Sequence, residues 1–351
     1  MSHGNPYTLI LNGRPFLFIY SPASLPFYAA FALFQLELAD QLWTITSVAL
    51  FVIAIIALSL TLKGDRKYVF VALAILLSLT SYPLLVNLQL GENDLLLAGV
   101  GILSLVCVKL NHRFASAVLL STATLLKGPP GLLLIYFVLF RKDLKYFAYF
   151  AVSTLAIIGA SLLIVPIGLY SYWILNVLPT FPTTSSALAI NLIDSTGMNI
   201  PNESVTGLLV LLHLNQFTPI VTGAAFVLLS LFAYRVGSKK LGSSRRALYG
   251  DAMFLMNVLC IILFGPRNAE LYPYVWVILP LALLLSALLM EQVRIEYLAL
   301  VGFAGFLLNY TLAPRFLYSP ILFPVELIGG LILTISLIPI FIRPSLIFKK
   351  A

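Results

Sequence analysis

Two short polar segments carry charged side chains suited to chemistry on a phosphate or a hydroxyl group. Gly91-Glu92-Asn93-Asp94 precedes an apolar run, so Asn93 or Asp94 is expected to begin a helix. The exposed amides and the dipole of a helix N-terminus favour anionic oxygens. The alternative is that Asp94 only caps its helix.

Lys127 stands between two short apolar runs and is followed by Gly-Pro-Pro, which ends one helix and starts the next. The flanking runs are apolar enough for a membrane, where a lone cation marks a functional site by default. The alternative is a side chain that only reaches the lipid headgroups.

Two further segments add polar side chains. Asn202-Glu203-Ser204 lies in a long polar stretch, and Arg267 follows an apolar run three residues before Glu270. Asn-x-Ser is formally a glycosylation sequence, and an Arg267–Glu270 pair with only a structural role is the alternative for the second segment.

Several other classes of site are not indicated. The three His residues (His3, His112, His213) have no Cys or carboxylate at metal-ligand spacing, so we expect no metal and no other cofactor. Gly128-Pro-Pro-Gly131 lacks the amide donors of a nucleotide-phosphate loop. The +8 net charge falls in short loops, which indicates membrane topology and not a nucleic-acid partner.

The elements that position these residues are membrane helices. The chain is 61% hydrophobic and only 10% charged, against about 45–50% and about 25% in globular proteins. Runs near the length of about 20 residues needed to cross the hydrocarbon lie at 42–62, 68–88, 95–110, 146–167, 217–235, 248–265, 274–290, 296–312 and 320–342. The shorter runs 114–126 and 129–140 predict a shallow helical hairpin. We therefore expect an all-α polytopic bundle of about nine to eleven transmembrane helices, forming one domain over residues 1–351.

The distribution of charge predicts the orientation. Of the 21 Lys and Arg residues, 17 fall in alternate connecting segments, and only Arg14, Lys127, Arg267 and Arg315 lie on the other side. The positive-inside rule places the 17 in the cytoplasm. A multi-pass protein of the cell membrane is thus expected, with residues 1–40 (an external loop and interfacial helix), a long external loop at 168–216 and all the polar segments above on the extracytoplasmic face.

The order of the motifs resembles glycosyltransferase family 87, the polyprenyl-phosphate-mannose-dependent mannosyltransferases of the C-type membrane superfamily. The resemblance covers nearly the whole chain, through short motifs in a shared order: Asn5-Pro6-Tyr7, Pro15-Phe16 with Tyr20-x-Pro22, Pro83 to Asn87 with Gly91 to Asp94, Leu126 to Pro129, Asn202-Glu203-Ser204 with Gly207, and Pro266 to Glu270.

The resemblance implies a C-type glycosyltransferase fold and transfer of a mannose-like hexose from a polyprenyl-phosphate donor to a hydroxyl of a glycan or glycolipid acceptor. Such an enzyme works among membrane lipids and needs no cofactor. The implied donor-phosphate ligands are Lys127 and Arg267. The implied sugar and acceptor contacts are Tyr7, Tyr20, Asn202, Ser204 and Glu270.

The chain departs from the family pattern at its acidic positions. Glu92 and Glu203 stand where the family has amides, and the family's Trp and His are not matched around Ala269 to Leu271. The family also has an earlier span with an acidic residue, its expected catalytic base, ahead of the Asn-Pro-Tyr motif. We therefore expect Glu92, Asp94 or Glu203 to replace that base, or an N-terminal span to be missing from this sequence.

Two other functions remain as alternatives. The first is a lipid-linked-sugar flippase or transporter, a class that often has repeated halves and polar residues at mid-span. No repeat is evident here, and the polar segments gather at one face. The second alternative is a catalytically inactive scaffold.

Overall fold

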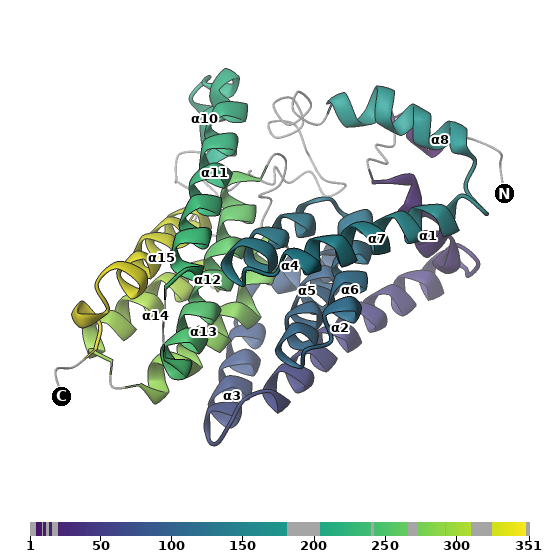
Figure 1. Ribbon diagram of the computed structural model, residues 1–351. Helices are drawn as coiled ribbons and strands as arrows, with labels where there is room; N and C mark the ends of the chain where they lie inside the picture. Colours follow the sequence, from purple (N-terminus) through teal and green to yellow (C-terminus); the bar gives the residue numbers. More distant parts are fainter. Residues whose placement is uncertain are drawn as a thin grey trace.

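The chain folds into a bundle of helices (Figure 1). The computed structural model describes residues 5–8, 10–11, 14–15, 20–180, 204–239, 242–265, 272–291, 293–309 and 325–348. In these parts the only strands are β1 (Ile10–Leu11) and β2 (Arg14–Pro15), which pair antiparallel. The expected all-α polytopic architecture is confirmed.

The first half of the chain forms one group of helices, on the right in Figure 1. Its elements are η1 (Pro6–Thr8), η2 (Pro22–Ser24), α1 (Leu25–Phe31), α2 (Leu36–Leu60), α3 (Arg66–Leu79), α4 (Tyr82–Leu90), α5 (Asp94–Lys109), α6 (Arg113–Leu126), η3 (Pro129–Leu133), η4 (Ile135–Phe140), α7 (Leu144–Ser161), α8 (Ile167–Tyr172), η5 (Trp173–Val177) and η6 (Leu178–Thr180).

The second half forms the group on the left. Its elements are α10 (Val205–Leu211), η7 (Asn215–Phe217), α11 (Thr218–Gly237), α12 (Ser243–Phe264), η8 (Tyr272–Val277), α13 (Ile278–Met290), α14 (Ile295–Asn309), α15 (Val325–Ile342) and η9 (Pro344–Leu346). The two groups join where α13 packs on α3 and where α11 packs on η4.

Six helical segments of the described chain are long and apolar enough to cross a membrane, and a bent pair makes a seventh. The remaining two predicted spans, 95–110 and 296–312, are the shorter helices Asp94–Lys109 and Ile295–Asn309. The two short helical runs predicted at 114–126 and 129–140 are present, as α6 followed by the 3-10 segment η3 and the π-helix η4.

The run predicted as one span at 68–88 is instead broken into α3 and α4, which meet at 61°. The Ser81 hydroxyl accepts the Leu84 amide at 3.2 Å and starts α4 afresh. Pro83 follows at the second helical position, where it lacks an N–H to bond to the preceding turn. The periodicity of the run hides this break, although Ser81 and Pro83 mark it.

The segment predicted as a long loop at 168–216 also differs from the expectation. Its described parts are largely helical: α8, η5 and η6 lie in its first part and α10 and η7 in its last. Residues 181–203 lie outside the described parts.

Helix α5 lies at the centre of the first group, between α2 and α6. It is buried along most of its length. Gly99 allows the close approach of α2, because a Cβ at this position would lie 3.0 Å from the backbone of Leu50. Small residues at such contacts let membrane helices pack closely. Helix α5 therefore provides a rigid support for the side chains at its two ends.

Candidate functional site

The N-terminus of α5 and the C-terminus of α6 meet in a buried ion pair. Lys127 Nζ donates to Asp94 Oδ2 at 2.5 Å. The Asp94 side chain is 1% exposed and that of Lys127 is 7% exposed. We call this end of the bundle the Lys127 end. A charge pair is rarely buried so deeply, so this pair is the candidate site for the expected phosphate chemistry.

The local sequence explains how both charges reach this position. Helix α4 ends at Gly91, whose φ of 64° is left-handed, and the Glu92 amide donates to the carbonyl of Asn87 at 3.1 Å. This glycine turn lets α5 begin three residues later with Asp94. Helix α6 ends at Lys127 because prolines follow at positions 129 and 130.

The environment of Lys127 favours its charged form. Burial, the largest single effect, lowers the pKa of Lys127, but the effects of the neighbouring Asp94, Tyr20 and Glu92 together outweigh it and raise the pKa. The resulting pKa lies above that of an ordinary lysine. Of the residues predicted for the site, these four are therefore brought together by the structure.

Aromatic side chains from the N-terminal segment cover the pair. The Tyr20 and Tyr28 rings lie 5.8 Å apart, and Asn93 Nδ2 donates to the Tyr28 hydroxyl at 3.0 Å. Burial raises the pKa of Tyr28 to about 12, and burial likewise raises that of Tyr20. Both hydroxyls thus keep their protons at neutral pH and remain able to donate a hydrogen bond.

Tyr7 lies beside this cluster and not within it. Its hydroxyl donates to the backbone carbonyl of Tyr20 at 2.9 Å, and its ring stacks on Tyr172 of α8 with centroids 6.0 Å apart. Tyr7 therefore holds the N-terminal segment against α8.

Ser204 is fully buried and caps α10. Its hydroxyl accepts the amide of Gly207 at 2.9 Å and lies 2.6 Å from the hydroxyl of Thr206. The other predicted site residues, Asn202, Glu203, Arg267 and Glu270, lie outside the described parts of the chain.

An apolar cavity of about 270 Å³ opens beside the last turn of α6, the helix that ends at Lys127. It is formed by η2 and α1 on one side and by α6 and α7 on the other, with Ala23, Ser24, Pro26, Phe27, Thr122, Leu125, Leu126, Ile157, Ala160, Ser161 and Ile164 in its lining. Leu126 and Phe27 directly precede Lys127 and Tyr28 in the chain. A charged group and an apolar cavity thus lie at the same end of α6, an arrangement that suits an amphipathic ligand.

Sequence reasoning missed three contributors to this region. Asp40 of α2 lies against the turn before α5, with Oδ1 3.6 Å from where a Cβ of residue 91 would be. Trp43 lies over Tyr28, with ring centroids 5.7 Å apart, and Tyr28 itself binds Asn93. The acidic start of α2 at Glu37 and Asp40 was the only signal that the sequence offered.

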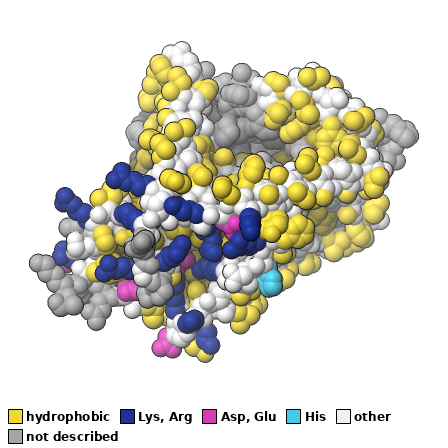
Figure 2. Space-filling view, in the orientation of Figure 1, with side chains coloured by type: hydrophobic (Ala, Val, Ile, Leu, Met, Phe, Trp, Pro, Cys, Tyr) yellow, Lys and Arg dark blue, Asp and Glu magenta, His cyan; other side chains and the backbone are white. Residues whose placement is uncertain are grey.

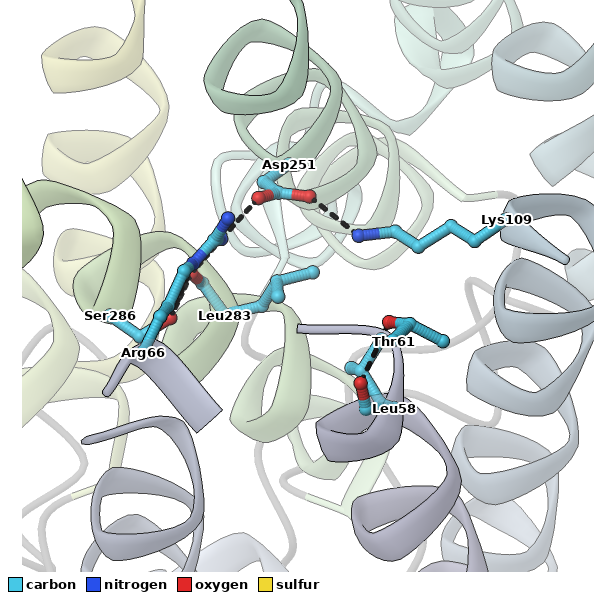
Figure 3. Close-up of polar contacts among 7 residues, drawn as sticks. All are labelled: Leu58, Thr61, Arg66, Lys109, Asp251, Leu283 and Ser286. Atoms are coloured by element: carbon cyan, nitrogen blue, oxygen red, sulfur yellow. Dashed lines mark hydrogen bonds and ion pairs between the residues drawn. The ribbon is translucent and has the colours of Figure 1, made fainter. Parts of the chain in front are cut away.

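A second charged cluster lies at the opposite end of α5, which we call the Lys109 end. Figure 3 shows Asp251 of α12 between Arg66 of α3 and Lys109 of α5. The nitrogen–oxygen distances are 2.5 Å and 3.2 Å. Arg66 also donates to the hydroxyl of Ser286 and the carbonyl of Leu283, and the Thr61 hydroxyl donates to the carbonyl of Leu58. This cluster ties the two groups of helices together.

Basic side chains are concentrated away from the candidate site. Lys and Arg gather over the lower part of the face in Figure 2, whereas the surface above them is mainly hydrophobic. The basic residues at helix ends and turns of the Lys109 end include Lys63, Arg141, Lys142 and Arg245. The two ends of the bundle therefore differ strongly in charge.

Within the described residues, no three His, Cys, Asp or Glu side chains come together as a metal site. The arrangement at the Lys127 end instead combines a charged ammonium, carboxylates, phenolic hydroxyls and an apolar cavity. This set can bind a phosphate attached to a hydrocarbon chain and can accept a proton from a hydroxyl.

Comparison with known proteins gives the family of the chain. No curated protein and no solved structure matches the chain. A family model described as glycosyltransferase family 87 matches residues 18–266, a range that contains Tyr20, Glu92, Asp94 and Lys127. The chain belongs to glycosyltransferase family 87 and is a multi-pass membrane glycosyltransferase.

Proposed function

We propose that this glycosyltransferase moves a hexose, mannose in the first instance, from a polyprenyl-phosphate donor to a hydroxyl of a glycan or glycolipid acceptor. The observation that carries the proposal is the buried Lys127–Asp94 pair beside an apolar cavity. A lipid-phosphate sugar has these two parts, an anionic phosphate and a hydrocarbon chain.

Lys127 is the proposed ligand of the donor phosphate. Its ammonium has three N–H donors, and charge-assisted bonds to phosphate are about twice as strong as neutral ones. Asp94, one of three candidates for the base, fits better as the group that orients Lys127. Its Oδ2 already accepts a hydrogen bond from the Lys127 ammonium. Arg267 is proposed as the second phosphate ligand.

Glu92 is the proposed general base, with Glu203 as the alternative. Glu92 is half-buried and close enough to Lys127 to affect its pKa. The acceptor oxygen attacks the anomeric carbon, and the bond from that carbon to the phosphate oxygen breaks. The hydroxyl proton passes to the carboxylate, and the lipid phosphate leaves with its negative charge held by Lys127.

The remaining predicted residues are proposed to contact the sugar and the acceptor. Tyr20 lies in the site and its hydroxyl stays protonated. Tyr7, Asn202, Ser204 and Glu270 are proposed around it. For Ser204 the contact would have to coexist with its capping of α10.

The proposed orientation places the Lys127 end on the extracytoplasmic face of the cell membrane. Its support is the accumulation of Lys and Arg at the other end of the bundle (Figure 2), which the positive-inside rule assigns to the cytoplasm.

Transfer from a radiolabelled donor tests the donor class. The purified protein in proteoliposomes is offered polyprenyl-phosphate-mannose, polyprenyl-phosphate-glucose or GDP-mannose, with a membrane glycolipid extract as acceptor. We expect transfer from a lipid-linked donor and none from GDP-mannose. Lys127→Ala should lower transfer about 10-fold or more, whereas Lys145→Ala, an exposed lysine at the other end, should not. Direct use of GDP-mannose contradicts the donor class, and full activity of Lys127→Ala contradicts the site.

A second comparison tests the cavity. Ala160→Phe places a ring in the cavity lining and should raise the KM for the lipid-linked donor. Ala156→Phe is the matched control, because Ala156 lies one turn earlier on the exposed surface of α7 and outside the lining. Equal donor KM values for the two variants would show that the hydrocarbon chain does not enter this cavity.

A further inference from the structure

Three hydroxyl groups form a closed cluster in the interior of the first helix group, about one helical turn from the ion pair of Arg113 and Asp143. Ser104 of α5 and Ser116 of α6 lie with their hydroxyls 2.8 Å apart, and each also donates to the backbone carbonyl of the other, at 3.1 Å and 2.7 Å. The hydroxyl of Tyr146 of α7 lies 2.9 Å from that of Ser116 and 3.3 Å from that of Ser104. All three residues are fully buried. We call them the hydroxyl clasp.

The clasp joins the same two helices that carry the candidate site. Ser104 follows Asp94 by ten residues and Ser116 precedes Lys127 by eleven. At 1.5 Å per residue, these separations are about 15 Å and about 16 Å. The clasp and the ion pair therefore lie at the two ends of one matched stretch of the antiparallel α5–α6 pair. Eleven residues make about three turns, so Ser116 and Lys127 share a face of α6.

Apolar packing alone does not determine the register of these helices. The turn at residues 110–112 joins α5 to α6, and beyond that turn the buried residues of the two helices are mostly Leu, Val, Gly and Ala, whose contacts are not directional. Reciprocal hydrogen bonds between two hydroxyls and two carbonyls are satisfied in only one register. Buried polar networks specify a unique arrangement in this way.

We infer that Ser104, Ser116 and Tyr146 are positioning residues, which fix the register of α5 against α6 and thereby set Lys127 opposite Asp94. None of the three touches the proposed substrates. A slip of one residue moves α6 by about 1.5 Å and turns it by about 100°, which breaks the 2.5 Å contact of Lys127. The effect on catalysis rests on the proposed function, whereas the effect on register does not.

Kinetics of clasp variants test the positioning role. Ser104→Ala/Ser116→Ala removes the clasp. Ser121→Ala/Thr154→Val is the matched control, because it removes two hydroxyls that bond to each other at 2.9 Å between α6 and α7 and leaves α5 untouched. We expect kcat/KM for the lipid-linked donor to fall about 10- to 100-fold without the clasp. A catalytic or binding group misplaced by about 1 Å has an effect of this size. The acceptor KM and the control variant should change less than about twofold.

Coupling to Lys127 separates positioning from a general loss of folded protein. In a Lys127→Ala background, clasp removal should cost less than about twofold, because the residue it positions is already absent. Loss by the same factor in both backgrounds, with both KM values unchanged, would overturn the inference.

A distance measurement tests the register without any assay of activity. Spin labels are placed at Leu90→Cys and Gly128→Cys, both exposed positions beside the two ends of the ion pair, after Cys107 and Cys260 are replaced by Ala. The distance distribution should be narrow in the parent and in the control variant, and should broaden or shift by at least about 1.5 Å without the clasp. An unchanged distribution would contradict the role of the clasp in fixing the register of α5 against α6. If the unaltered protein transfers no sugar although removal of the clasp changes the distribution, the proposed function fails and the register role stands.

Discussion

At the scale of single residues, the Lys127–Asp94 pair costs free energy to bury. Removing a carboxylate and an ammonium from water costs several kcal/mol each, about as much as their attraction returns. Apolar residues of similar volume would fill this position at no loss of stability. The chemistry of the site, and not stability, is therefore the better reason for the pair.

Replacing the pair separates its two effects. Lys127→Met leaves a buried carboxylate without its partner and should destabilise the protein by about 3–5 kcal/mol. The double variant Asp94→Leu/Lys127→Met should recover most of that loss and still lack transfer activity. Thermal unfolding in detergent and a transfer assay measure the two effects. Recovery of activity together with stability would contradict the role of the pair.

The raised pKa of Lys127 predicts the pH dependence of donor binding. Its pKa lies above the ordinary value of about 10.4. The ammonium of Lys127 therefore contributes fully to donor binding at every pH below that ordinary pKa. The contribution is lost only as pH rises through the raised pKa. The donor KM, measured from about pH 6 to about pH 9.5, should show no rise due to Lys127. A rise above about pH 8 that disappears in Lys127→Met would contradict this prediction.

The sequence predicted the individual site residues unevenly. Lys127 was recognisable because a lone cation between apolar runs is costly in a membrane and marks a functional site by default. Its pairing with Asp94 was not recognisable, because the register of two helices depends on buried contacts such as the hydroxyl clasp. Tyr28 and Asp40 were missed because each reaches the site only through the packing of α1 and α2.

At the scale of elements, the turn between α4 and α5 sets where the acidic residues point. Gly91 has a left-handed φ of 64° and Gly64, in the turn between α2 and α3, has a φ of 57°. A side chain in this conformation costs about 1–2 kcal/mol. The two glycines therefore form a natural pair for comparison, one at the site and one at the other end of the bundle.

Gly91→Ala and Gly64→Ala should destabilise the protein to a similar extent. Only Gly91→Ala should lower sugar transfer beyond that loss, because the strain is relieved by moving Glu92 and Asp94. Unfolding midpoints and transfer rates per folded molecule provide the comparison. An equal effect of both variants on the rate would show that the turn does not set the site.

Hydrophobic runs predicted most helices to within a few residues, for instance 95–110 for α5 (Asp94–Lys109). Prediction from hydrophobic runs failed where a helix-capping serine or a proline interrupts an apolar run. Ser81 and Pro83 break one predicted span into α3 and α4, and prolines at 129 and 130 give η3 and η4 in place of a regular helix. Length and hydropathy do not register such breaks.

At the scale of the whole molecule, the two ends of the bundle differ in charge. The Lys109 end has most of the described cations, with Asp251 bound between Arg66 and Lys109 (Figure 3). The Lys127 end has acidic and aromatic side chains and the apolar cavity. This asymmetry supports the proposed orientation, in which the Lys127 end lies on the extracytoplasmic face.

Cysteine labelling tests this orientation. In a background without Cys107 and Cys260, Gly128→Cys should react with a membrane-impermeant maleimide in intact cells, because residue 128 is exposed at the Lys127 end. Lys142→Cys, exposed at the other end, should react only after the membrane is permeabilised. The reverse pattern would invert the topology.

Binding of a polyprenyl monophosphate to the Lys127 end is the decisive measurement for the proposed donor site. Affinity is measured by scintillation proximity with a radiolabelled lipid, for the unaltered protein and for Asp94→Leu/Lys127→Met, in which the buried charges are removed together. We predict a loss of about 10- to 100-fold in affinity, the value of one charge-assisted contact of about 1.5–3 kcal/mol, in a protein that unfolds at about the same temperature. Equal affinity of the two folded proteins would contradict a phosphate site at Lys127.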